Sequence, residues 1–451
     1  MGKTKQKQDR SHYLFSNREL ANLIGPLVIE QLLAVFVGMA DSIMVANVGE
    51  AAVSGVSLVD NIMILIINIF AALATGGAVV AGQYIGRKDE KSACKAATQL
   101  VWFVSLSAVA IMILVYFGKD IILNQVFGHI TAEVKGHADI YLLIVTASIP
   151  FIALYNGGAA IFRAMGNSQV SMRVSLLMNA TGNAILVFGL RIGTAGVAIP
   201  TLISRMVAAI VITVLLCNQT RILHIERTLK IRFDGRMIRK ILAIGVPNGL
   251  ENSMFQLGKI LVLSLVSTFG TYAIAANAVS NAIALFQILP GMAISLAITT
   301  VISQCVGAND YEQVHYYLKK LLAIIYVAMV GTVALIFLAL PLILKAYNLS
   351  DQTAAAATNI IHFHGISAMI IWPLSFALPA AYRAAGDAKA CMYTSIVSMW
   401  IFRIGFSYLV GKYMGLGVFG VWVAMVIDWV VRAICFIIRY FNGKWKHGAI
   451  V

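Results

Sequence analysis

Charged residues are scarce in this sequence. They make up 12% of its 451 residues, whereas hydrophobic residues make up 60%. Soluble globular proteins are about 25% charged, so the composition excludes an ordinary soluble domain. Apolar stretches of about 20 residues, enough for one membrane-spanning helix, recur along the whole chain. The short, strictly alternating segments of a membrane β-barrel are missing. We therefore predict an all-α integral membrane protein.

Cysteine is also scarce. The five cysteines lie far apart, so the sequence holds no CxxC pair for metal binding or redox chemistry. It also has no Walker motif, no DDxxD and no HxxxxD. The segment GLGVFG (415–420) fits GxGxxG, but it joins two apolar stretches rather than a strand and a helix, which excludes a dinucleotide site. We expect no enzyme activity and no organic cofactor.

Basic residues outnumber acidic ones, 34 to 19, and concentrate in alternate loops between the apolar stretches. This asymmetry is typical of loops on the cytoplasmic side. Because no basic segment of domain size lies outside the membrane, nucleic acid is not an expected partner. The apolar run after KTKQKQDR is too long for a cleavable signal and contains Glu30 and Asp41. We expect a multi-pass protein of the cytoplasmic (inner) membrane, with both termini in the cytoplasm.

Twelve spans are predicted, near residues 21–47, 54–84, 97–118, 136–162, 171–190, 194–217, 241–268, 273–305, 321–345, 357–381, 391–411 and 416–440. The longest polar break, 221–240, separates them into two groups of six. The predicted organisation is an N-terminal tail (1–20), an N-lobe (21–220), a linker (221–240), a C-lobe (241–440) and a C-terminal tail (441–451). Both tails and the linker are expected in the cytoplasm.

The two halves repeat each other. Several residues recur 221 positions later: Pro26 and Pro247, Glu30 and Glu251, Gly49 and Gly270, Gln83 and Gln304, Gly86 and Gly307. Further along, IFRAMGNSQVSM (161–172) is similar to AYRAAGDAKACM (381–392). Each half begins on the same side of the membrane, so the repeats are parallel. Such halves are related by an axis along the membrane normal, and transporters often place a central site between them.

These residues resemble the MATE (multidrug and toxic compound extrusion) family. Its first helix carries a proline and then an Asp eight residues before a glycine, as do Pro26, Asp41 and Gly49. Its loops are similar to AGQYIGRKDEKSA (81–93), ISQCVGANDYEQV (302–314), FRAMGNSQ (162–169) and YRAAGDAK (382–389). The resemblance implies a two-lobe antiporter with a V-shaped cavity. It also implies export of organic, often cationic and amphipathic compounds in exchange for Na⁺ or H⁺.

Asp41 is the leading candidate for the ion site. An ionisable side chain at membrane depth costs about 2.5–3.5 kcal/mol and persists where it meets water, a partner or an ion. Asn179 and Asn183 are four residues apart and share a helix face. Thr201 follows Pro200, which leaves a backbone carbonyl unpaired in its span. The resemblance implies that Asp41, Asn179, Asn183 and Thr201 bind Na⁺, or that Asp41 carries a proton. Many members have Asp at the place of Asn183, so this sequence lacks the second carboxylate of their proton relay.

Other charged and proline residues inside the spans are weaker candidates. Glu30 and Glu251 are repeat-related acids that could line a cavity, couple ions or hold a structural contact. Pro26, Pro200 and Pro247 are predicted hinges. Lys259 and Arg403 also lie in C-lobe spans, where Asp428 and Arg432, four residues apart, are predicted to form a structural ion pair.

Three other functions stay open at this point. One is a flippase of lipid-linked or other amphipathic cargo on the same fold. A membrane-embedded transferase is disfavoured by the missing motifs, and a channel would show single-channel currents rather than saturable flux. We expect small organic substrates, contact with the lipid bilayer, and a monomer with no obligate protein partner.

Overall fold

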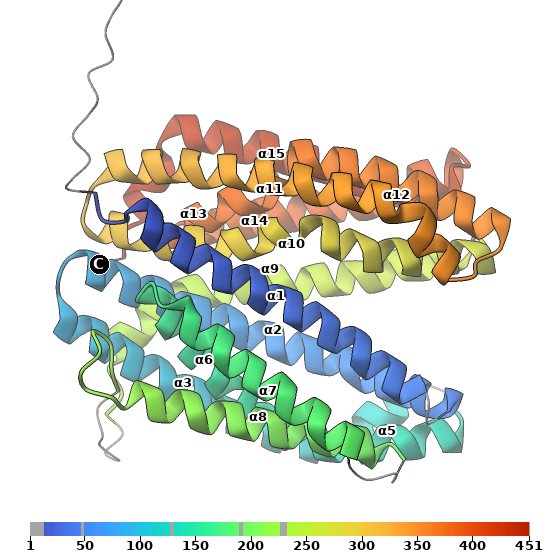
Figure 1. Cartoon of the computed structure of the whole chain (residues 1–451), viewed down its shortest axis with the longest axis horizontal. Coiled ribbons are helices and arrows are strands. Elements are labelled where there is room, and N and C mark those ends of the chain that lie inside the picture. The colour runs from blue at the N-terminus through green and yellow to red at the C-terminus, as the bar shows by residue number, and fades with distance from the viewer. Residues whose placement is uncertain (1–12, 47–48, 127–129, 189–192, 226–231, 451) are drawn as a thin grey trace, which may run out of the picture.

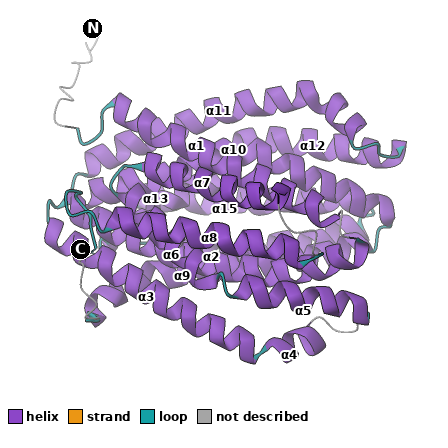
Figure 2. Ribbon diagram, turned by 60° about the horizontal axis from the view of Figure 1, so that its bottom comes forward, coloured by secondary structure: helices purple, strands orange, loops and turns teal. Residues whose placement is uncertain are grey.

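The computed structural model describes residues 13–46, 49–126, 130–188, 193–225 and 232–450, with the backbone alone for residues 39–46, 126, 183–184 and 186–188. Within these ranges the chain forms helices joined by loops and turns, with no strand (Figure 2). The all-α architecture predicted from composition is confirmed.

The helices of the N-lobe are α1 (Asn17–Ala46), α2 (Glu50–Gly86), α3 (Glu90–Phe117), α5 (Ala132–Thr146), α6 (Ile149–Ala164), α7 (Ser168–Phe188) and α8 (Ala195–Leu216). A short α4 (Lys119–Ile121) and the π-helical η1 (Ile122–Val126) precede α5. The fourth predicted span is not one helix, because α5 and α6 meet at a bend of 47°. Pro150 lies in the first turn of α6. Backbone N–H groups in this turn have no partner within the helix, so proline removes no intrahelical hydrogen bond there.

The C-lobe repeats this order with α9 (Gly235–Ser267), α10 (Thr271–Gly307), α11 (Tyr311–Ala346), α12 (Asp351–Trp372), α14 (Ala388–Ser398) and α15 (Gly417–Asn442). The π-helical η2 (Pro373–Ala377) joins α12 to α13 (Leu378–Ala384), and η3 (Met399–Gly405) and η4 (Ser407–Tyr413) extend α14. A 3₁₀ turn, η5 (Lys444–Gly448), follows α15. Pro373 and Pro379 lie at the starts of η2 and α13. Because proline has no backbone N–H to donate, each interrupts the regular hydrogen bonding of an α-helix.

In the described part of the chain, nine helical stretches are long and apolar enough to cross a membrane, and the bent pair α5–α6 makes a tenth. The remaining two predicted spans are also helical, as α7 and α9. All twelve predicted positions therefore carry helix. Most of these helices begin a few residues earlier than predicted, and N-cap side chains fix several of the starts. Ser16 and Glu19 form a reciprocal capping box before α1. Asp234 accepts from the N–H groups of Arg236 and Met237, so α9 starts inside the predicted linker.

The two lobes meet along the first two helices of each. α2 packs against α9 and α10, and α1 packs against α10. Figure 1 shows α1 running obliquely between the C-lobe helices α11, α12 and α15 and the N-lobe helices α6, α7 and α8. Pro26, Pro200 and Pro247 lie inside continuous helices, and their predicted hinge role stays a prediction.

The lobes are in close contact at the terminal end of the bundle, which we define as the end that carries residues 13–17 and 443–450. Here the C-terminal ends of α2 and α10 cross. A Cβ added at Gly86 would fall inside contact distance of the carbonyl oxygen of Gln304, and one at Gly307 would do the same to that of Gln83. Only glycine allows two helix backbones to approach this closely.

Both ends of the described chain cross to the opposite lobe. Leu14 N donates to Gln313 Oε1, and the backbone of Phe15 forms two hydrogen bonds with the Tyr317 hydroxyl. Gln313 and Tyr317 both lie on α11 of the C-lobe. In the other direction, Ile450 N donates to Gln83 Oε1 of the N-lobe. The terminal end is therefore closed by helix packing and by both chain ends.

Candidate functional site

The predicted ion site lies where α1, α7 and α8 are neighbours, since α1 packs on α7 and α7 packs on α8. The Thr201 hydroxyl is half-buried and donates to the carbonyl of Val197 at 3.2 Å. Asn179 Nδ2 is buried with no hydrogen-bond partner among the described residues. The side chains of Asp41 and Asn183 lie outside the described part, although their backbones are helical. The fold brings the helices together, and the set of four ligands stays a prediction.

Glu30 is held in a buried polar network rather than in an open cavity. Its carboxylate accepts from Ser171 Oγ at 2.8 Å and lies 3.4 Å from Arg163 Nη1. The Tyr155 hydroxyl is 3.5 Å away. These partners come from α6 and α7, so Glu30 ties α1 to two other helices of its lobe.

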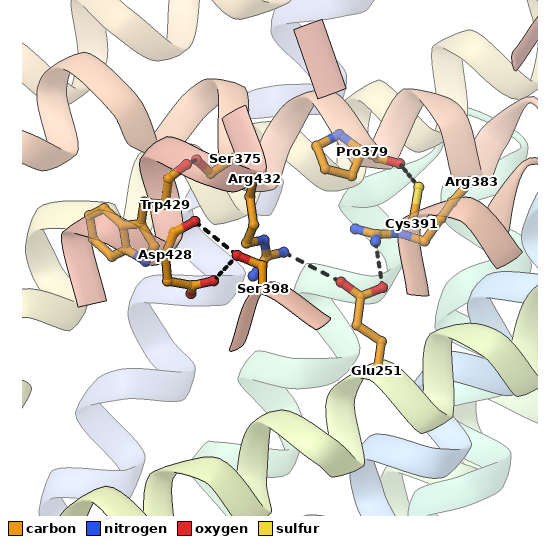
Figure 3. Close-up of polar contacts among 9 residues, drawn as sticks. All are labelled: Glu251, Ser375, Pro379, Arg383, Cys391, Ser398, Asp428, Trp429 and Arg432. Carbon is orange, nitrogen blue, oxygen red and sulfur yellow. Dashed lines mark hydrogen bonds and ion pairs between the residues drawn. The ribbon is translucent and has the colours of Figure 1, made fainter. Parts of the chain in front are cut away.

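Glu251 stands in the equivalent place in the C-lobe but holds two arginines. One carboxylate oxygen lies 3.1 Å from Arg383 Nη1 and the other 3.5 Å from Arg432 Nη2. Figure 3 shows the carboxylate between these two guanidinium groups. Because Arg163 and Arg383 belong to matching segments of the repeat, each lobe contains a Glu–Arg pair between its first and fourth spans.

The predicted ion pair between Asp428 and Arg432 is wrong. Asp428 Oδ1 accepts from Ser398 Oγ at 2.5 Å, whereas Arg432 turns to Glu251 (Figure 3). The spacing of four residues places both on one side of α15, but tertiary partners on α14 and α9 determine where each side chain goes. The Arg432 guanidinium lies 4.4 Å from the ring centroid of Phe376 and 4.8 Å from that of Phe255, within cation–π range of both.

A cavity of about 700 Å³ adjoins this cluster. Its walls come from α9, α10, α12, α13, α15 and the π-helical segments η2 and η3, and Asn68 on α2 is the one described lining residue from the N-lobe. The aromatic part of the lining consists of Phe255, Trp372, Phe376, Trp422 and Trp429. The charged part consists of Glu251, Lys259, Arg383, Arg403 and Arg432.

Polar groups are fixed around the aromatic walls. Trp422 Nε1 donates to Asn277 Oδ1 at 3.0 Å. The buried ring of His364 stands edge-on to Trp422 and Trp429, at 5.4 and 5.3 Å between centroids. Cavities with apolar walls and a few fixed polar groups are typical of sites for small organic molecules.

Sequence reasoning placed Lys259 and Arg403 in the spans but did not find this cavity. One signal was present: the lining residues Asn252, Phe255, Lys259 and Val262 recur every three or four residues on α9. In the described part of the chain, no group of three or more His, Cys, Asp or Glu side chains is placed to hold a metal ion.

A family model described as MatE matches residues 26–188 and 247–409, and the two matches begin 221 residues apart, the offset of the internal repeat. The chain is 28% identical over 456 residues to the uncharacterized transporter YisQ of Bacillus subtilis, covering 98% of this chain and 96% of that protein. It is 22% identical over 443 residues to a probable multidrug resistance protein NorM of Thermotoga maritima, covering 96% and 94%.

The fold is also found among solved structures. An outward-facing conformation of a multidrug resistance MATE family transporter of the MOP superfamily aligns with a TM-score of 0.88 at 22% identity, covering 94% of this chain and 95% of that one.

Proposed function

The chain belongs to the MatE family of membrane transporters, and on that premise we propose that it is a secondary active antiporter, exporting amphipathic organic compounds in exchange for Na⁺ or H⁺. The observation that carries this proposal is the cavity of about 700 Å³ inside the C-lobe, with aromatic walls and charged side chains. A compartment of this size holds a small organic molecule. The cavity lies within one chain, so the proposed unit is a monomer with no obligate partner.

The closed terminal end supports an alternating-access mechanism. If both termini face the cytoplasm of a cell with the protein in its inner membrane, the lobes are joined on the cytoplasmic side in this state. Opening there would require α2 and α10 to separate at Gly86 and Gly307. Cargo would then enter from the cytoplasm and leave after the terminal end closes again.

Coupling requires an ion that binds one state better than the other. We propose that Asp41 binds this ion, with oxygen atoms of Asn179, Asn183 and Thr201 as further ligands for Na⁺. Asn179 supports this role because its amide nitrogen is buried and has no hydrogen-bond partner among the described residues. Asp41 could instead take up a proton, and the same residues are compatible with either ion.

The test is transport by the purified protein in proteoliposomes. Efflux of amphipathic dyes of either charge is followed under an imposed Na⁺ gradient and, separately, under a pH gradient. We expect one gradient to drive saturable flux of at least one dye. Absence of gradient-driven flux for every dye would contradict the antiporter, and lipid-linked cargo would be tried next.

A further inference from the structure

The C-lobe cavity carries more positive than negative charge. Lys259, Arg383, Arg403 and Arg432 line it, and Glu251 is the single acid among its described lining residues. Asp428 adds a second carboxylate nearby, on the helix of Arg432, but it is turned toward Ser398. Four cationic groups therefore meet two carboxylates, and the excess is positive.

Part of this positive charge has no ion-pair partner in the described part of the chain. Glu251 is shared by Arg383 and Arg432. Lys259 and Arg403 form no ion pair and no side-chain hydrogen bond with any described residue. Arg432 is 1% exposed, and its Nε and Nη1 atoms are buried without a hydrogen-bond partner among the described residues. Unpaired cations within a membrane are costly unless an anion or water compensates them.

The aromatic residues provide flat apolar surfaces next to these cations. Trp372 stacks on Phe376 at 5.2 Å with an interplanar angle of 17°, and Trp429 meets Phe376 edge-on at 5.7 Å. Phe376 also packs against the Arg432 guanidinium. A planar ring bound beside these side chains would place an attached anionic group within the positively charged part of the cavity.

We propose that the cargo of this cavity is an organic anion, built from an aromatic body and a carboxylate or sulfonate group. This inference rests on the proposed transport function and specifies its substrate class. Arg403 and Lys259 bind the anionic group, since guanidinium and ammonium donors pair strongly with carboxylate and sulfonate oxygens. Phe255, Phe376 and the tryptophans bind the aromatic body. A cationic drug, the cargo class that the family resemblance implies, would meet like charges in a poorly screened site.

A pair of dyes with similar ring systems and opposite charge tests the proposal. Fluorescein is anionic at mildly alkaline pH, whereas the methyl ester of tetramethylrhodamine is a cation on the same xanthene skeleton. Binding of each dye to the full-length protein in neutral-lipid nanodiscs is measured by fluorescence anisotropy. We expect fluorescein to bind at least about tenfold more tightly than the rhodamine ester.

Variants at the unpaired cations assign the effect to the cavity. Arg403→Gln and Lys259→Gln should each weaken fluorescein binding by about tenfold or more, without weakening binding of the rhodamine ester. Lys412→Gln and Lys345→Gln are the matched controls, because both lysines are exposed and lie outside the cavity lining. Thermal unfolding of each variant shows whether a lost affinity reflects a lost fold.

The outcomes separate this inference from the transport proposal. Tighter binding of the rhodamine ester, binding of neither dye, or fluorescein affinity unchanged in Arg403→Gln and Lys259→Gln would overturn the anionic class. Gradient-driven export of the cationic dye alone would also overturn the anionic substrate class, but it would support the proposed antiporter function. Charge-selective fluorescein binding without gradient-driven flux would support the anion site and contradict the antiporter.

Discussion

Gln83 and Gln304 make the same contact in opposite directions across the lobe interface. Gln83 Nε2 donates to the carbonyl of Ala384 in the C-lobe at 2.9 Å, and Gln304 Nε2 donates to the carbonyl of Ala164 in the N-lobe at 2.7 Å. Both glutamines are buried, and each lies one helical turn before Gly86 or Gly307. A typical hydrogen bond contributes about 1 kcal/mol net. Two such bonds therefore hold the lobes together without preventing their separation.

The first prediction concerns the helix crossing at the terminal end. Gly86→Ala and Gly307→Ala each place a methyl group against the backbone of the opposite helix. Overpacking of this kind costs about 1–3 kcal/mol, so we expect the equilibrium to shift toward a state open at the terminal end. Spin labels at Lys91 and Lys319, one in each lobe, should report longer distances. Gly331→Ala, where an added Cβ meets nothing within 4 Å, is the control. Unchanged distances in both alanine variants would contradict this role of the crossing.

The second prediction compares the two repeat-related acids. Glu251→Gln leaves two guanidinium groups without their carboxylate, and removing one partner of a buried pair costs about 3–5 kcal/mol. Glu30→Gln should cost less, because Arg163 is its one ionic partner among the described residues and the hydroxyls of Ser171 and Tyr155 can bond to an amide. Thermal unfolding in detergent measures the loss of stability in each variant. Glu133→Gln, at an exposed site, should have little effect. Equal stability of all three variants would show that the pairs are not structural.

The third prediction concerns coupling. Asp41→Asn should abolish ion-driven export while the protein still inserts and folds, because the amide carries no charge to bind Na⁺ or exchange a proton. Thr201→Val should weaken a Na⁺ site but leave proton coupling in place, since it removes only one oxygen ligand. Flux in proteoliposomes under each gradient is the measurement, with Asp120→Asn at an exposed position as the control. Normal export by a well-folded Asp41→Asn variant would rule out this ion site.

The fourth prediction concerns the segment before α1. The Tyr317 hydroxyl accepts from Phe15 N at 2.9 Å and donates to Phe15 O at 2.7 Å. Tyr317→Phe removes both bonds, so the amides of residues 13–17 should exchange hydrogen faster in a mass-spectrometric measurement. Tyr326→Phe is the matched control, because Tyr326 lies on the same helix as Tyr317, but its bond goes to the carbonyl of Ile370 on α12, away from this segment. Equal exchange in both variants would mean that aromatic packing against Tyr316 and Tyr317 is sufficient.

Hydropathy and the internal repeat predicted the helices and the two lobes, because both depend on patterns visible along the chain. The repeat also identified Glu30 and Glu251 as equivalent before their arginine partners were known. The partner of Asp428 was predicted wrongly, because spacing along α15 cannot show which residues of other helices lie nearby. In the structure Asp428 bonds to Ser398, and Arg432 pairs with Glu251. The cavity was missed for the same reason. Its cations come from α9, α13, α15 and η3, and only tertiary packing brings them to one place.

Each end of the described chain binds the opposite lobe, and this arrangement bears on whether the two lobes could assemble from separate polypeptides. Residues 13–17 precede the N-lobe and bind α11 of the C-lobe, whereas Ile450 follows the C-lobe and binds Gln83 of the N-lobe. A chain severed between α8 and α9 would yield two fragments, each with a short peptide that recognises the other. Co-expressed as separate polypeptides, the fragments should reassociate, so that the molecule behaves as a heterodimer of its own halves.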